Sequence, residues 1–232
     1  MKIKKVYLPI VIFMFCLGFV GCQGEPNGDT EKKLESEVES EVGSETEGEE
    51  LENTISQEKM EWFENVFFND DENKIVNFFL SSEYDSVVNI DLGDLFHNGD
   101  NGLGGSGEMS DDEKALAINH FGLGNLDVSK AGKEDMDAVL QKYAGLTLEN
   151  TNKVGLERLF YVEATNTYYK VVGDTKYKKC DITKGWVNED GTITLRYCDA
   201  LSSISDTYEV TLKKVGDSYQ FVSNKILDEE NK

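Results

Sequence analysis

The sequence predicts an α+β fold, with helices in the first part of the folded region and an antiparallel β-meander at its end. Apolar residues recur at helical spacing in 56–69 and in 133–143. From Leu156 onward they alternate with polar residues, which is the period of a β-strand. This order of helices and then strands is typical of α+β domains. A curved-sheet cone with a central pocket is one arrangement that would fit it.

Two segments carry start and stop signals for helices. In SQEKMEWFENVFFN (56–69), Met60, Phe63 and Phe67 lie on one stripe, and Thr54 or Ser56 can cap the first turn. The run SDDE (110–113) has the pattern of a capping box and predicts a helix to about His120, with a stop at Gly122.

Further elements are expected before the strands begin. A helix over 133–143 should end at Gly145, and one more turn is expected over 148–153. Residues 75–80 are apolar and predict a buried segment. A surface excursion is expected next, followed by only a short turn at 90–96.

Six strands are expected, at 160–162, 167–172, 180–187, 192–198, 208–215 and 218–224. The run Val215-Gly216-Asp217-Ser218 predicts a two-residue type II′ hairpin, because glycine stands first in the turn. Asn188-Glu189-Asp190-Gly191 predicts a second hairpin loop between 180–187 and 192–198.

The register of that second hairpin follows from matching apolar side chains. Pairing apolar with apolar residues places Trp186 opposite Ile193 and Ile182 opposite Tyr197, since cross-strand neighbours share a face. Cys180 then shares the face of Ile182, and Cys198 points to the other side. We therefore expect two unpaired thiols, although cysteines in an exported domain often form a disulfide.

The first residues of the chain have the character of an export signal. Lys2, Lys4 and Lys5 form a positive segment, and 6–20 is almost wholly apolar but short for a permanent membrane span. Gly21-Cys22 follows. This pair resembles a lipobox, in which the cysteine thiol receives a diacylglyceryl group and becomes the new N-terminus. Two acyl chains are what stable anchoring requires.

The lipobox pattern departs from the usual one at Phe19, where leucine is common. The alternatives are an ordinary signal peptide, or a retained membrane anchor in which Cys22 has no role. On the lipoprotein interpretation, 1–21 is a signal peptide that the mature protein lacks, and Cys22 carries the lipid, including palmitate.

An acidic segment, 22–54, separates Cys22 from the folded domain. It holds twelve acidic residues, two lysines and no aromatic residue. Such a composition cannot bury enough apolar surface to offset its ordering entropy, so we expect a disordered tether of at most about 110 Å. A frayed helix from Glu45 onward is the alternative. Either one would serve as a spacer between the membrane and a single domain over 55–227, with a disordered tail at 228–232.

The charge balance excludes some partners. Without Lys2, Lys4 and Lys5 the chain has 20 basic and 45 acidic residues, a formal net charge of −25. We therefore expect no nucleic-acid partner, because nucleic-acid binding depends on Lys and Arg neutralising phosphates. Electrostatic adhesion to anionic lipid heads is disfavoured as well, so contact with the membrane should come from the lipid at Cys22.

Motifs for catalysis or metal binding are weak, and we expect no catalytic residue, metal ligand or cofactor. The run GGSGE (104–108) does not complete a G-x-S-x-G elbow. His97 and His120 are the only histidines, and Cys180 and Cys198 lie in ordinary strand patterns. Oxygen ligands for calcium occur near a glycine-rich loop, but their spacing fails as an EF-hand; they are Asp91, Asp94, Asn98, Asp100 and Asn101.

Aromatic residues are numerous in the strand region, and they are Tyr168, Tyr169, Trp186, Tyr197, Tyr208, Tyr219 and Phe221. Because strand side chains alternate between faces, about half would lie on a core face. The others could form an exposed binding patch.

Four stretches carry a likeness to known proteins: FFLSSEYDSVVNIDLGDLFHNG, AVLQKYAGLTLEN, TNTYYKVVGDT and YEVTLKKVGDSYQFVSN. Over most of 62–224, the chain resembles uncharacterised lipoproteins of Gram-positive bacteria. The resemblance implies a domain on the extracytoplasmic face of the cell membrane, and Cys22 is the one functional residue that it transfers.

Together these features predict a lipid-anchored, extracytoplasmic lipoprotein of the cell envelope, with a non-enzymatic domain that binds a ligand, a protein or a glycan. The alternative is an exported hydrolase with a carboxylate-lined cleft. The two differ in whether two carboxylates converge in a concave site, about 5–9.5 Å apart.

Overall fold

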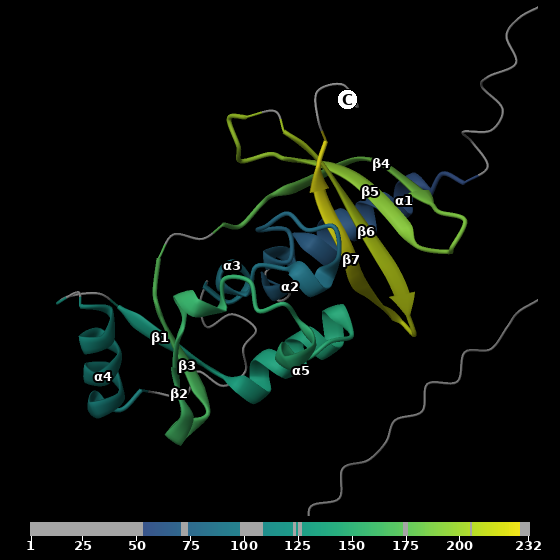
Figure 1. Cartoon of the computed structure of the whole chain (residues 1–232). Helices are drawn as coiled ribbons and strands as arrows, with labels where there is room; N and C mark the ends of the chain where they lie inside the picture. Colours follow the sequence, from purple (N-terminus) through teal and green to yellow (C-terminus); the bar gives the residue numbers. More distant parts are fainter. Residues whose placement is uncertain are drawn as a thin grey trace, which may run out of the picture. The chain divides into compact units, whose positions relative to one another are not determined.

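In the computed structural model, helices occupy the first part of the described chain and antiparallel strands the second, which confirms the α+β prediction (Figure 1). The structure describes residues 53–70, 74–97, 109–122, 124, 127–173, 176–204 and 206–227. These residues belong to a unit that spans Ser44–Lys232. The predicted signal peptide, Cys22, most of the acidic tether and the tail at 228–232 lie outside the described residues.

The described elements follow one another along the chain. The longer helical segments are α1 (Gln57–Trp62), the π-helix η1 (Phe63–Phe68), α2 (Lys74–Phe78), α3 (Leu92–His97), α4 (Asp111–Phe121) and α5 (Lys133–Ala144). The 3₁₀ turns are η3 (Val87–Asn89), η4 (Leu148–Asn150), η5 (Leu156–Arg158) and η6 (Glu163–Thr165). The strands are β1 (Val128–Gly132), β2 (Phe160–Val162), β3 (Thr167–Val171), β4 (Cys180–Val187), β5 (Ile193–Asp199), β6 (Thr207–Val215) and β7 (Ser218–Ile226).

The predicted helix caps are present. The Ser56 side chain accepts a hydrogen bond from the Lys59 N–H at the start of α1. At the start of α4, Ser110 and Glu113 form both halves of the capping box. Gly122 and Gly145 end α4 and α5 in the left-handed conformation, each with φ of +69°, which glycine adopts without steric cost.

Two elements differ from their prediction. Residues 90–96 form more than the predicted short turn, because most of them belong to the helix α3. Ile90, Leu92, Leu95 and Phe96 are all fully buried. The strand β1 was not predicted, because its sequence VSKAG combines only five residues with a lysine and a glycine.

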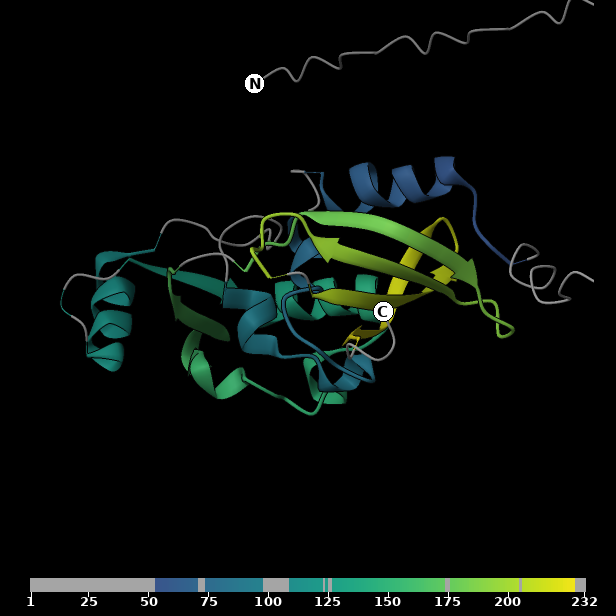
Figure 2. The same ribbon diagram turned by 90° about the horizontal axis from the view of Figure 1, so that it is seen from above.

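The strands form two antiparallel sheets. One has the order β1-β3-β2, and the other is the C-terminal meander β4-β5-β6-β7. The predicted hairpin at Gly216 is present, with Val215 paired to Ser218. Helix α4 contacts β1 and β3, whereas α1 and η1 contact β4, and α5 contacts β7 (Figure 2).

A bulge at Thr183 corrects the predicted register of β4 and β5. Ile182 lies opposite Tyr197, as predicted, but the pairing shifts between Ile182 and Lys184. Trp186 therefore lies opposite Thr194, not opposite Ile193. Because one extra residue exchanges the two faces of a strand, Trp186 leaves the core side and Gly185 takes that place.

The core side of the meander is filled by aromatic side chains. Phe67 of η1 stacks on Phe221 of β7, and Phe68 meets the same ring edge to face. Phe221 in turn stacks on Phe79 with ring centroids 4.6 Å apart. All four are buried. In a cone fold this side of the sheet would hold a central pocket. Here it holds part of the hydrophobic core.

Candidate functional site

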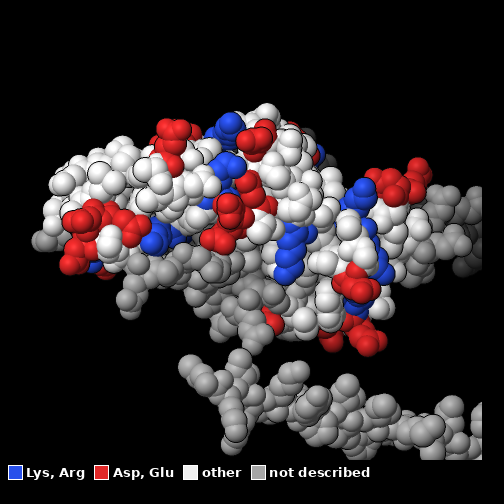
Figure 3. Space-filling model, turned by 90° about the horizontal axis from the view of Figure 1, so that it is seen from below, with Lys and Arg blue, Asp and Glu red and all other residues white. Residues whose placement is uncertain are grey.

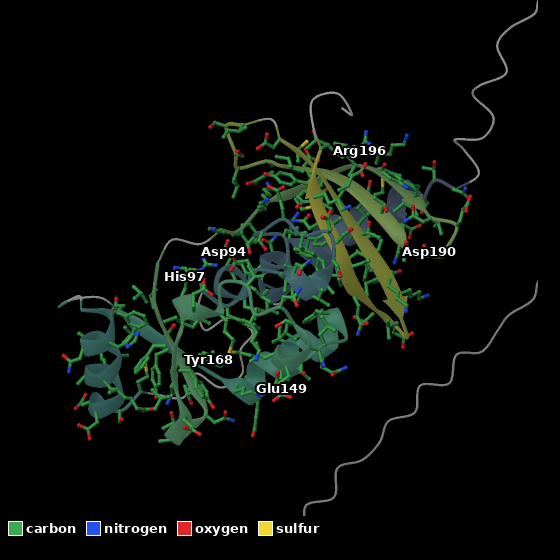
Figure 4. The ribbon with its side chains drawn as sticks, in the orientation of Figure 1. Asp94, His97, Glu149, Tyr168, Asp190 and Arg196 are labelled. Atoms are coloured by element: carbon green, nitrogen blue, oxygen red, sulfur yellow. The ribbon has the colours of Figure 1, made fainter. Side chains whose placement is uncertain are left out.

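The densest group of charged side chains in the described part of the chain surrounds Asp94. Asp91 precedes α3, Asp94 and His97 lie in α3, Arg158 ends η5, and Lys176 lies between β3 and β4. We call these five residues the Asp94 cluster. Figure 4 shows Asp94 and His97 near one another on α3.

Arg158 holds the two carboxylates together. Its Nη1 donates to Asp94 Oδ1 at 2.7 Å, and its Nη2 donates to Asp91 Oδ1. Lys176 Nζ donates to the other oxygen of Asp94 at 2.6 Å. Asp91 Oδ1 also accepts the backbone N–H of Asp94 at 2.9 Å, so it helps to start α3. Each carboxylate is thus paired with at least one cation.

Glycine allows this close approach. Gly155 has a φ of +72°, and a Cβ placed there would collide with Asp91 and Arg158. A Cβ at Gly93 would collide with the guanidinium of Arg158. Both glycines therefore leave the space in which Arg158 reaches α3.

The environment lowers the pKa values of Asp94 and His97. Burial raises the pKa of Asp94, but hydrogen bonds from Lys176 and Arg158 outweigh burial and hold it below its usual value. Burial lowers the pKa of His97, and the positive charges of Lys170 and Arg158 lower it further. At neutral pH Asp94 is therefore ionised and His97 is neutral.

The predicted calcium candidates are brought together only in part. Asp91 and Asp94 do meet, although on Arg158, while Asn98, Asp100 and Asn101 lie outside the described residues. Among the residues that the structure describes, no group of three or more His, Cys, Asp or Glu side chains is placed to hold a metal ion.

The two strand cysteines are both free. Cys198 lies opposite Asp181, and Cys180 lies opposite Asp199, so the two thiols are on different faces, as predicted. Cys180 is buried, and burial raises the pKa of its thiol well above the usual value, which keeps it protonated. His120, the second histidine of the sequence, stacks on Phe160 with ring centroids 3.8 Å apart.

The strand aromatics divide between core and surface. Tyr169, Tyr197, Tyr219 and Phe221 are buried, so they belong to the core and not to an exposed patch. Tyr168, Tyr208 and Trp186 are partly exposed. Of these, Trp186 lies on the side of the meander that faces away from the core.

Sequence reasoning found Asp91, Asp94 and His97 but missed Arg158 and Lys176. Their partners in α3 are 64 and 82 positions away, so no local spacing connects them. The glycine at 155, three residues before Arg158, was the one local signal of a close contact there.

Three comparisons bear on the identity of the chain. No protein-family model, no curated protein and no solved structure matches it. Within the described residues, there is no helix with the length and apolar character needed to cross a membrane.

Proposed function

We propose that this chain is a membrane-anchored, extracytoplasmic lipoprotein whose folded domain binds a protein or glycan partner without catalysing a reaction. The lipid is attached to Cys22, behind the apolar run 6–20 and the small residue Gly21. The acidic segment that follows spaces the domain from the membrane. Cys22 and this segment are supported by the sequence pattern alone.

One structural observation favours binding over hydrolysis: Asp91 and Asp94 are both held by Arg158. A glycan hydrolase needs one carboxyl group that stays protonated to donate a proton, and such a group has a raised pKa. The pKa of Asp94 is lowered. The other described carboxyl groups whose pKa is clearly shifted, Glu113 and Asp190, are lowered as well.

The charges of the domain surface also fit a soluble module held near a membrane by lipid. On the face seen in Figure 3, basic and acidic side chains are interspersed over the described surface. The acidic net charge of the chain keeps the domain soluble and works against direct adhesion to anionic lipid heads.

Metabolic labelling tests the anchor. Bacteria that express the full chain are fed an alkyne analogue of palmitate, and the protein is then captured and probed for the label. We expect label on the wild type and on Cys16→Ser, which removes the other cysteine of the leader region, and no label on Cys22→Ser. An unlabelled wild type, or a labelled Cys22→Ser variant, contradicts the proposal.

An assay for hydrolysis tests the second half of the proposal. The full chain is incubated with cell-wall glycan, and released reducing ends are measured. We expect none above background. Release that disappears in both Asp91→Asn and Asp94→Asn would identify the domain as a hydrolase instead.

A further inference from the structure

The meander β4–β7 presents one of its faces away from the core, and this face has an ordered set of side chains. Cross-strand pairing aligns Trp186, Thr194, Thr211 and Ser223 in one row and Lys184, Arg196, Glu209 and Lys225 in the next. We call these eight residues the outer face. Its opposite side carries Leu195, Tyr197, Val210 and Leu212, all fully buried in the core.

The helices α1, η1 and α5, which contact the meander, lie on its core side. The described contacts of α1 and η1 with β4, and of α5 with β7, belong to the side that buries Phe63, Phe67 and Phe221. Arg196 projects from β5 away from α2 and α5 (Figure 4). Trp186 reaches the outer face because the bulge at Thr183 turns it there.

Hydrogen bonds hold the polar groups of the outer face in fixed positions. Arg196 donates from Nε at 3.1 Å and from Nη2 at 2.7 Å to a single oxygen of Glu209, Oε1. Its Nη1 and the Oε2 of Glu209 take no part in this pair. The guanidinium carbon of Arg196 lies 5.9 Å from the centre of the Trp186 ring.

Hydrogen bonds also fix the hydroxyl groups in the row that begins with Trp186. Thr194 Oγ1 lies 3.1 Å from Thr211 Oγ1, and it accepts a hydrogen bond from Asn188 Nδ2 at 2.9 Å. All these groups are on strands or at a hairpin of one sheet, which fixes them better than loops would.

We propose that the outer face is a binding site for a neutral glycan, with Trp186 as the stacking surface and the Arg196–Glu209 pair as the hydrogen-bonding edge. A sugar ring has an apolar C–H face and an equatorial belt of hydroxyl groups that both donate and accept. An indole ring beside a fixed donor and a fixed acceptor is complementary to both parts.

The charge of the chain decides between neutral and anionic ligands. A formal net charge of −25 after loss of the leader repels polyanions, and Glu209 and Asp85 offset Arg196 and Lys225 on the face itself. A neutral saccharide meets no such repulsion. The assignment rests on the proposed function, since it names the partner of a domain held in the glycan-rich cell envelope.

Tryptophan fluorescence tests the site directly, because the chain has only two tryptophans, Trp62 and Trp186. Full chain from residue 22 with Cys22→Ser and Trp62→Phe is titrated with hexamers of β-1,4-linked glucose and of N-acetylglucosamine. We expect a saturable change in Trp186 emission with at least one of them. Calorimetric titration of Trp186→Ala and Arg196→Leu should show affinity at least about tenfold weaker.

Two variants make the test specific. Tyr161→Ala removes another exposed aromatic ring, from β2, and should bind as the wild type does. Trp186→Tyr keeps a stacking ring and should recover most of the affinity lost in Trp186→Ala. Circular dichroism on each variant identifies any that fails to fold. If Trp186→Ala does not fold, the affinities of Arg196→Leu and Trp186→Tyr are compared with that of the wild type instead.

The site is overturned if neither hexamer binds, or if binding persists unchanged in Trp186→Ala and Arg196→Leu. It is also overturned if only polyglutamate, used as an anionic probe, binds. Failure of the palmitate labelling would remove the anchor but leave these titrations unaffected, so the two proposals fail separately.

Discussion

The side-chain amide of Asn69 pairs with the backbone of Cys180 as a neighbouring strand would. Its Nδ2 donates to the Cys180 carbonyl at 2.8 Å, and its Oδ1 accepts the Cys180 N–H at 3.0 Å. Asn77 does the same at Lys178, and a carboxylate oxygen of Glu64 accepts the N–H of Ile182. These helical side chains satisfy the outward backbone groups of the β4 edge, which would otherwise be a template for another strand.

Replacing Asn69 should therefore destabilise the domain. Asn69→Ala removes two hydrogen bonds and leaves a partly buried N–H and C=O without partners, so we expect a loss of about 2 kcal/mol in the free energy of unfolding. Urea denaturation followed by circular dichroism measures it. Asn65→Ala, which removes an exposed amide bonded to the Glu61 carbonyl one turn earlier, is the control and should cost much less. Equal losses would contradict the edge-pairing role.

Glu113 should make stability depend on pH in acid. The backbone N–H of Ser110, then Lys130 and the Tyr169 hydroxyl, lower its pKa to about 2. Because the folded value is depressed, its contribution is complete above its ordinary pKa of about 4.3 and is lost as the pH falls toward 2. Between about pH 4.3 and pH 2, the free energy of unfolding of the wild type should fall by about 1–2 kcal/mol more than that of Glu113→Gln. This figure allows for solvent screening of the partly exposed carboxylate.

Urea unfolding at pH values from 6 to 2 gives this curve. Asp112→Asn, which changes an exposed acid in the same helical turn, should leave the curve nearly as in the wild type. A Glu113→Gln curve that runs parallel to the wild type at every pH would show that Glu113 is not the titrating group.

The two strand thiols should differ in reactivity. In the chain with Cys22→Ser, from residue 22 onward, we expect a thiol-specific reagent to modify Cys198 in the native protein and Cys180 only after unfolding in urea. Cys180 is buried and stays protonated, whereas Cys198 is partly exposed. Mass spectrometry of digested protein locates the label. Protein that takes up no label even in urea without reductant would reveal a disulfide.

A methyl group at position 185 should destabilise the contact between β4 and Ile55, which lies near the start of the described residues. Ile55 donates its N–H to the Gly185 carbonyl at 3.0 Å, and a Cβ at Gly185 would lie 2.7 Å from Ile55 Cδ1 and 2.9 Å from Leu195 Cδ2. We expect Gly185→Ala to cost about 1–3 kcal/mol through overpacking.

A double-mutant cycle checks that contact. Ile55→Ala makes room for the new methyl group, so the cost of Gly185→Ala should fall in the Ile55→Ala background. Thermal unfolding of the four proteins supplies the cycle. Additive costs would mean that the clash is with Leu195 alone.

Elements with strong local signals could be predicted from the sequence. The helical run from Gln57, α4 and α5 have caps or glycine stops, and β2 to β7 have period-two alternation. The helix α3 was missed because Asp91, Gly93 and Asp94 interrupt its apolar residues, and its burial comes from distant segments. The strand β1 exists through its pairing with β3, about forty residues later.

The candidate sites were predicted less completely, for the same physical reason. Asp91, Asp94 and His97 stood out because they are close together in sequence. Arg158 could not be predicted, because it meets these residues only in the folded chain, where η5 lies against α3. The outward position of Trp186 depends on one unpaired residue in β4, which no periodicity in the sequence reveals.

The additional residue at Thr183 also determines how this segment tolerates changes in length. Deleting it would remove the bulge and leave a regular strand in which Lys184, Gly185 and Trp186 keep their present partners in β5, so the indole ring would stay on the outer face. A related chain that lacks one residue at this point would therefore lose only the bulge, because every side chain after it in the strand would keep its interior or solvent-facing position.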